Sequence, residues 1–123
     1  MYYVCPMNIE NSKAQMRKGI LEFCILAIIA AEDEIYPSDI IEKMKDAKLI
    51  VVEGTLYPLL TRLKNGGLLD YNWVESKSGP PRKYYKLTEI GKVYLSELIN
   101  TWGELARAVS LILKKSAKNE QDN

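Results

Sequence analysis

The sequence contains no histidine, only two cysteines and a single phenylalanine among its 123 residues. Histidine is the commonest general base and the commonest metal ligand in proteins, so its absence disfavours both acid–base catalysis and a zinc site. The sequence also lacks a metal-ligand cluster and a glycine-rich phosphate loop. We therefore expect a protein that is not an enzyme and that holds no metal and no cofactor.

The two cysteines, Cys5 and Cys24, do not favour a disulfide. Cys24 lies in an apolar helical pattern, where a free cysteine acts as a small hydrophobic residue and burial makes a redox-sensor role unfavourable. The N-terminus lacks the basic stretch and small-residue cleavage site of a signal peptide. We predict a cytoplasmic protein with reduced thiols, and both Met1 and Met7 stay open as the biological start.

Long hydrophobic runs are also missing. The longest apolar segment, residues 19–31, contains Glu22 and is 13 residues long, whereas a membrane-spanning helix needs about 20. We expect this segment to be a core helix and the protein to have no membrane partner.

Excess charge of either sign is small, because 17 basic and 16 acidic side chains give a formal net charge of +1. The charges are nevertheless unevenly distributed. Residues 32–34 are all acidic, and the segment between Ser76 and Thr88 contains four cations and no acid: Lys77, Arg82, Lys83 and Lys86. Such local clustering, rather than net charge, is what a nucleic-acid partner requires.

Two helices are predicted in the first part of the chain. Apolar side chains recur at helical spacing over residues 12–31, and the second half of this segment is apolar nearly all round. Pro37 and Ser38 then open a helix that runs to about Ala47, with proline in the first turn and serine as the N-cap.

A third helix is predicted to begin near Gly54 or Thr55. Thr55 can cap the free amides, and Pro58, which has no amide hydrogen, is best tolerated in a first turn. Gly66 and Gly67 end the helix, where a left-handed residue is favoured.

Two strands follow. Leu69, Tyr71 and Trp73 alternate with polar residues, which predicts a half-buried strand. Residues 78–81, Ser-Gly-Pro-Pro, are expected to turn the chain without pairing. The second strand covers residues 82–87, with two inward side chains, Tyr85 and Leu87, and three on the opposite face, Arg82, Tyr84 and Lys86.

The last helix, capped by Thr88, is predicted over residues 89–115 and would be roughly 40 Å long. Its apolar side chains follow a heptad seam, widened by Leu98, Leu105 and Ile112, that predicts a dimer interface. The seam consists of Leu95, Ile99, Trp102, Ala106, Val109 and Leu113. The alternative, that this helix packs only on its own core, stays open.

The resulting order is mainly helical: α-α-α-β-β, a winged helix-turn-helix, followed by a long C-terminal helix. We divide the chain into a flexible extension (1–11), a winged-helix DNA-binding domain (12–88), a dimerisation helix (89–115) and a disordered tail (116–123). The segments EGTLYPLLTRLKNGGLL (53–69) and PRKYYKLTEIG (81–91) resemble the PadR family of bacterial transcription regulators. This resemblance implies a homodimeric repressor on double-stranded DNA, released by a small hydrophobic or aromatic effector.

Carried over residue by residue, the resemblance implies a set of DNA-binding positions. Those on the recognition helix are Thr55, Tyr57, Pro58 and Arg62, and those on the wing are Lys77, Arg82, Lys83 and Tyr85. Alternation along the second strand favours a core position for Tyr85 instead. The start of the helix would offer amides and a hydroxyl to phosphates, and the wing cations would follow the minor groove.

In a dimer the seam would bring Trp102 toward its symmetry mate. The resemblance implies that a tryptophan at this place can stack on flat molecules, although interface packing alone is the alternative. A dimer of this kind reads an inverted repeat with half-sites about one helical turn apart. Two alternatives for the whole protein stay open: a winged-helix module that binds another protein instead of DNA, and a ligand sensor that binds no DNA.

Overall fold

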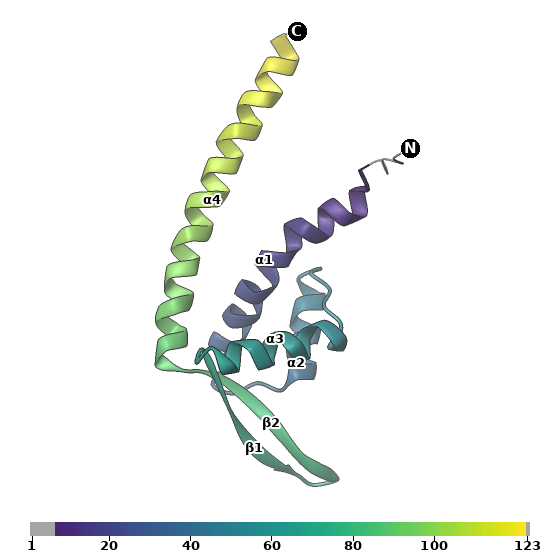
Figure 1. Cartoon of the computed structure of the whole chain (residues 1–123), viewed down its shortest axis with the longest axis vertical. Coiled ribbons are helices and arrows are strands. Elements are labelled where there is room, and N and C mark those ends of the chain that lie inside the picture. Colours follow the sequence, from purple (N-terminus) through teal and green to yellow (C-terminus); the bar gives the residue numbers. More distant parts are fainter. Residues whose placement is uncertain (1–6, 123) are drawn as a thin grey trace, which may run out of the picture.

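The computed structural model describes residues 7–122. Its elements in chain order are α1 (Ile9–Ala30), α2 (Pro37–Asp46), α3 (Glu53–Asn65), β1 (Leu69–Ser76), β2 (Gly79–Leu87) and α4 (Glu89–Asp122). Figure 1 shows three helices gathered into a body, with the β1–β2 hairpin projecting from one end and α4 extending from the other. This arrangement confirms the predicted winged helix with a long C-terminal helix.

α1 begins at Ile9, three residues before its predicted start. Asn8 occupies the N-cap, and its Oδ1 accepts a hydrogen bond of 2.9 Å from the backbone amide of Glu10. Such a cap satisfies one of the free amides of the first turn. The predicted flexible extension is therefore wrong for its last three residues, which are helical.

The next two helices begin without a side-chain cap. α2 starts at Pro37 as predicted, but Tyr36 holds the N-cap position, so Ser38 is not the cap. α3 starts at Glu53 after Val52, one to two residues before the predicted start.

Pro58 consequently lies inside α3 rather than in its first turn. It has no amide hydrogen to donate to the carbonyl of Gly54, four residues earlier. Gly54 is exposed, so water can replace the missing donor. The end of α3 is as predicted: Gly66 is the C-cap, and Gly67 has a left-handed φ of 82°.

β1 and β2 form an antiparallel hairpin that begins at the pair Leu69 and Leu87. The turn consists of residues 77–78, because Ser76 already pairs with Gly79. The two prolines after Gly79 therefore belong to β2, and the prediction that they form the turn is wrong. They occupy an irregularity in the register, where an unpaired residue needs no amide donor.

A short third strand contact was missed by the sequence patterns. Ile35 and Tyr85 form an isolated bridge, with backbone hydrogen bonds of 3.0 Å from the Ile35 amide and 2.8 Å from the Tyr85 amide. A single bridged residue produces no alternating pattern in the sequence, so residues 32–36 are predicted only as a polar break between two helices. The bridge fastens β2 to the segment that precedes α2.

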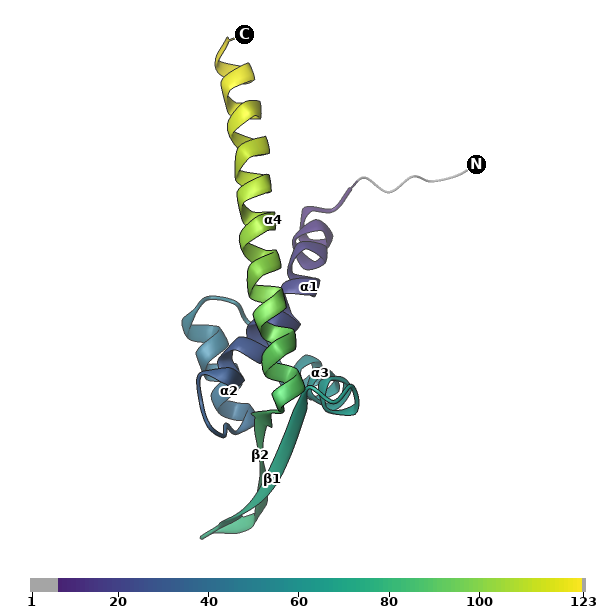
Figure 2. The same cartoon turned by 90° about the vertical axis from the view of Figure 1, so that its left-hand side faces the viewer.

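The core lies between α1, α2, α3, the base of the hairpin and the start of α4, and all its buried side chains are apolar. Tyr85 is buried, which confirms its predicted inward position. Trp73 is 62% exposed, which contradicts the half-buried prediction. Figure 2 shows the reason: the hairpin extends past the helices, so its outer half has no core to face.

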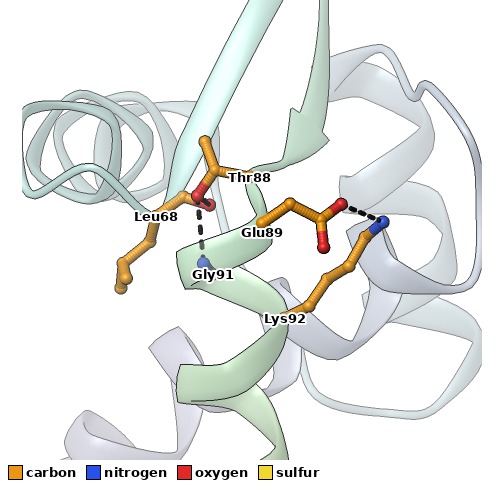
Figure 3. A network of polar contacts seen from close by, with 5 residues as sticks. All are labelled: Leu68, Thr88, Glu89, Gly91 and Lys92. Carbon is orange, nitrogen blue, oxygen red and sulfur yellow. Dashed lines mark hydrogen bonds and ion pairs between the residues drawn. The ribbon is translucent and has the colours of Figure 1, made fainter.

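α4 is attached to the domain at Thr88, as Figure 3 shows. The Thr88 hydroxyl oxygen accepts a hydrogen bond of 3.0 Å from the Gly91 amide and donates to the carbonyl of Gly67 at 2.6 Å. This confirms Thr88 as the cap of α4. The Thr88 amide also donates to the Leu68 carbonyl at 3.0 Å, so the start of α4 and the end of α3 are joined through one residue.

α4 continues to Asp122, so the tail predicted from Ser116 onward is helical almost to its end. The physical reason is that the sequence after Gly103 contains no glycine or proline and is rich in alanine, lysine and leucine. At 1.5 Å per residue its 34 residues span about 51 Å. Within residues 7–122, no helix is both long and apolar enough to cross a membrane.

Candidate nucleic-acid interface

The exposed side of α3 presents most of the residues predicted to contact DNA. Leu56, Leu60 and Leu63 are buried against the core. The remaining face carries Thr55, Tyr57, Pro58 and Arg62, all of them exposed. The helix is thus fixed by one apolar side and offers the other to a partner.

A hollow of about 270 Å³ lies between α3, the wing (residues 69–87) and the start of α2. Three of the predicted DNA-binding residues, Tyr57, Arg82 and Lys83, are brought together in its lining. Side chains from residues far apart in the sequence complete it: Tyr36, Pro37, Thr61, Trp73, Pro81 and Tyr85. The hollow therefore combines hydroxyl groups, aromatic rings and two cations.

Thr55, Pro58, Arg62 and Lys77 do not line this hollow. Lys77 is placed in the turn at the tip of the wing, and Thr55 and Pro58 are exposed on α3. Arg62 forms an ion pair with Glu22 of α1, although its side chain is 72% exposed. Its guanidinium is therefore already engaged within the chain, which the sequence did not indicate.

Aromatic rings hold the two wing cations that line the hollow. The Arg82 guanidinium lies 5.0 Å from the ring centroid of Tyr36. The Lys83 ammonium lies 4.6 Å from the Tyr71 centroid and 5.2 Å from the Trp73 centroid. Cation–π contacts of this kind restrict long side chains while leaving their charge available.

The hydroxyl of Tyr57 remains protonated at neutral pH. Partial burial raises the pKa of the Tyr57 phenol above its usual value, with further increases from Tyr36 and Glu53. A protonated phenol can donate a hydrogen bond to a phosphate oxygen. Tyr57 is 44% exposed, so an external ligand can reach it.

A cluster of acidic side chains lies beside α2. A separate hollow beside α2 is lined by Glu32, Glu34, Asp39 and Glu42, together with Ile35 and Lys43. Glu34 also accepts a hydrogen bond of 2.8 Å from Asn72 on β1. The wing is thus basic from its turn to Lys86, whereas the surface next to α2 is acidic.

The predicted DNA-binding residues do not include five others that line the hollow: Tyr36, Pro37, Thr61, Trp73 and Pro81. Thr61 lies one helical turn after Tyr57, so helical periodicity places it on the same face. Alternation predicts a half-buried Trp73 rather than a ligand-facing one, and no local signal places Tyr36 beside the wing. That position depends on the bridge between Ile35 and Tyr85.

The exposed apolar surface of α4 includes most of the predicted dimer seam. Ile99, Trp102, Val109 and Leu113 are exposed, and Ala106 is half-buried. Leu95 is buried in the core of its own chain, which makes it unavailable to a partner in this arrangement. The seam open to another molecule therefore begins at Ile99.

Trp102, the predicted effector-binding residue, lies near α1. Its ring centroid is 6.3 Å from that of Phe23, with the planes inclined at 46°, and the indole is 46% exposed. One side of this side chain thus packs within the chain while another is accessible.

No site for a metal ion is formed in the described part of the chain, where no three histidine, cysteine, aspartate or glutamate side chains cluster suitably. Burial raises the pKa of the Cys24 thiol, which lowers its reactivity. Cys5 lies outside the described residues, so the predicted absence of a disulfide between these cysteines stays a prediction.

Comparison with known proteins agrees with this architecture. Residues 25–97 match the transcriptional regulator PadR-like family. A PadR-like transcription factor from Bacteroides fragilis is 61% identical, with a TM-score of 0.70 over 83% of this chain and 98% of that one. A PadR-like transcriptional regulator from Bacillus cereus is 40% identical, with a TM-score of 0.72 over 80% and 96% of the two chains.

A PadR family transcriptional regulator from Eggerthella lenta has the same fold, with 30% identity and a TM-score of 0.76 over 85% of this chain and 91% of that one. The family match covers more than half of the sequence, including α3, the wing and the first part of α4. The chain therefore belongs to the PadR-like family of transcriptional regulators.

Proposed function

We propose that this protein is a repressor that binds an inverted-repeat operator as a homodimer and leaves DNA when a small hydrophobic or aromatic effector binds. The observation that carries the proposal is the hollow where Tyr57 of α3 meets Arg82 and Lys83 of the wing. An exposed helix enters a major groove, and a basic hairpin beside it reaches the adjacent minor groove. Bound at a promoter, such a dimer would repress by occlusion.

The predicted contacts divide into two kinds. Thr55 and Tyr57, near the start of α3, are proposed to touch phosphates and base edges, and Pro58 to approach the groove beside them. The wing cations Lys77, Arg82 and Lys83 would neutralise phosphates, which gives affinity with little sequence preference. Arg62 joins them only when its ion pair with Glu22 opens.

The test is a fluorescence anisotropy titration with duplexes from the region upstream of the protein's own gene, at two salt concentrations. Binding should weaken steeply with salt, because neutralised phosphates release counterions. Replacing Arg82 and Lys83 together by alanine should weaken binding to all duplexes and reduce the salt slope by about 0.9 per lost phosphate contact.

The matched control replaces Lys114 and Lys115 by alanine, which removes the same charge from exposed positions on α4 far along the chain from the wing. This pair should leave the salt slope nearly unchanged. Failure to bind any upstream duplex would reject the proposal, and equal effects of the two double variants would reject the wing as the contact.

We further propose that the effector binds beside Trp102. The partly exposed indole and its contact with Phe23 on α1 support this position, because a flat ligand can stack on an accessible aromatic face. A panel of flat aromatic compounds should quench tryptophan fluorescence and lower DNA affinity together. A Trp102→Ala variant that responds to the same compound as strongly as the unaltered protein would contradict the assignment.

A further inference from the structure

Trp73 is an exposed indole that neither the core nor the proposed dimer seam uses. It lies on β1 opposite Lys83, with which it is paired in register, so the two side chains project from the same face of the hairpin. The indole is 62% exposed and helps to line the hollow that also contains Tyr57 and Thr61. A ligand that enters this hollow would therefore meet the indole beside the two wing cations, Arg82 and Lys83.

Two aromatic residues, Tyr71 and Tyr85, connect Trp73 to the core. Tyr85 is buried, and its ring centroid lies 5.7 Å from that of the half-buried Tyr71. The Tyr71 centroid lies 6.1 Å from that of Trp73, with the two planes nearly perpendicular at 88°. This row becomes more exposed toward the tip, and its edge-to-face contact limits the motion of the indole.

The Lys83 side chain is held by the same row. Its ammonium lies 4.6 Å from the Tyr71 ring centroid and 5.2 Å from the Trp73 ring centroid. The Lys64 ammonium of α3 lies 5.4 Å from the same Tyr71 centroid. Trp73 therefore restricts where the Lys83 charge can lie. A charge held in place loses less conformational freedom when it binds a phosphate.

The position of the hollow indicates what passes through it. A helix in a major groove and a hairpin in the neighbouring minor groove must stand on either side of one sugar–phosphate strand. The hollow lies between α3 and the wing and is lined by four residues that carry a hydroxyl and by two cations, groups that suit phosphate oxygens. The indole adds an N–H donor and an apolar face that suits deoxyribose.

We infer that Trp73 contacts the sugar–phosphate strand between the two grooves and positions Lys83 against the same strand. This inference rests on the proposed DNA-binding function. Trp73 would therefore contribute to DNA affinity rather than to sequence specificity, since deoxyribose and phosphate are the same at every base pair.

The first test uses the intrinsic fluorescence of the unaltered protein while a labelled duplex reports binding by anisotropy. Tryptophan emission should change, and acrylamide access should fall, along the same isotherm as the anisotropy. In Trp73→Phe the duplex should still bind, but this emission change should largely disappear, because Trp102 alone remains. An unchanged emission response in Trp73→Phe, or no response in either protein while the duplex binds, would overturn the inference and leave the proposed function intact.

Affinity provides the second test. Trp73→Ala should weaken binding about twofold to fivefold on every duplex, the equivalent of an exposed cation–π contact, and Trp73→Phe should weaken it less. Val93→Ala is the matched control, because Val93 is a similarly exposed apolar side chain on α4, outside both the wing and the hollow. Lys83→Ala should have a smaller effect in the Trp73→Ala background than alone, as expected for coupled residues.

Equal affinities for Trp73→Ala and Val93→Ala would overturn the direct contact, and additive effects of Trp73 and Lys83 would overturn the positioning role. Absence of duplex binding by the unaltered protein would instead reject the proposed function itself. Because Trp73 is exposed, its variants should keep the thermal unfolding midpoint of the unaltered protein, which identifies any loss of binding as a loss of contact.

Discussion

Arg82 and Lys83 are neighbours in β2, but different aromatic side chains hold them. Arg82 lies over Tyr36, from the segment before α2, whereas Lys83 lies over Tyr71 and Trp73 of β1. Alternation along a strand sends neighbouring side chains to opposite faces. The wing can therefore offer positive charge on both of its faces, which suits a hairpin lying in a groove between two phosphate strands.

Arg62 differs from the wing cations because its partner is a carboxylate of its own chain. In free protein Glu22 holds the guanidinium, and a DNA phosphate would have to compete with it. We therefore expect Glu22→Gln to increase duplex affinity about twofold to fivefold, since a surface ion pair is worth up to about 1 kcal/mol. Anisotropy titrations at fixed salt measure this change.

Glu10→Gln is the control for this prediction, since Glu10 belongs to the same helix and also pairs with a cation, Lys13. It should change affinity little. If the two variants bind DNA equally, Arg62 makes no phosphate contact.

At the scale of elements, the junction between the wing and α4 depends on a close approach of the α4 backbone at Gly91 to the Leu68 carbonyl. A Cβ built on Gly91 would lie 2.2 Å from the Leu68 carbonyl oxygen and 3.2 Å from a Leu87 methyl group. The first turn of α4 can therefore pack here only with glycine. Gly91 and the Thr88 cap together fix the direction in which α4 leaves the domain (Figure 3).

Gly91→Ala should destabilise the fold by about 1–3 kcal/mol, as overpacking of a buried position does. Gly103→Ala, in the same helix but with nothing within 4 Å of its Cβ position, should instead stabilise by about 0.5–1 kcal/mol through helix propensity. Urea unfolding at one fixed protein concentration compares them. Stabilisation by both substitutions would show that the junction tolerates a side chain.

The sequence predicted most elements because their signals are local. Helical periodicity identified α1 to α4, glycine ended α3, and Thr88 capped α4 as expected. The predicted first residues of the helices were less accurate. α3, for example, begins after Val52, which has no capping side chain. Periodicity reports burial averaged over a strand, so it could not show that β1 leaves the core beyond Tyr71.

The site was predictable only in part for a related reason. Tyr57, Arg82 and Lys83 could be named from the sequence, and the structure brings them into one hollow. The partners of those side chains depend on contacts between distant segments, such as Arg62 with Glu22 and Arg82 with Tyr36. Neither residue spacing nor composition contains that information.

At the scale of the whole molecule, α4 is longer than its own domain can cover. Its first turns contribute Leu95 and Leu98 to the core, but Figures 1 and 2 show the helix continuing well beyond the other elements. Exposed apolar side chains follow on this outer part: Ile99, Trp102, Leu105, Val109, Leu111, Ile112 and Leu113. An isolated monomer would keep this surface in water, so a second copy is the partner we propose.

Val109→Glu tests this arrangement directly. In a homodimer the substitution places two carboxylates in one apolar seam, so the dimer dissociation constant should rise about a hundredfold or more. Asn100→Glu is the matched control. Asn100 precedes Val109 by nine residues, or two and a half helical turns, so it lies on the opposite side of the helix. Sedimentation equilibrium of the three proteins measures the association.

The same variants link association to DNA binding. Val109→Glu should bind a single half-site as well as the unaltered protein does, because α3 and the wing are untouched. On the full inverted repeat it should lose most of the affinity that the dimer gains over a single half-site, since two copies are no longer held at the spacing of two major grooves. If Val109→Glu stays dimeric with unchanged affinity for the repeat, the outer part of α4 is not the interface, and another surface must bring two recognition helices together.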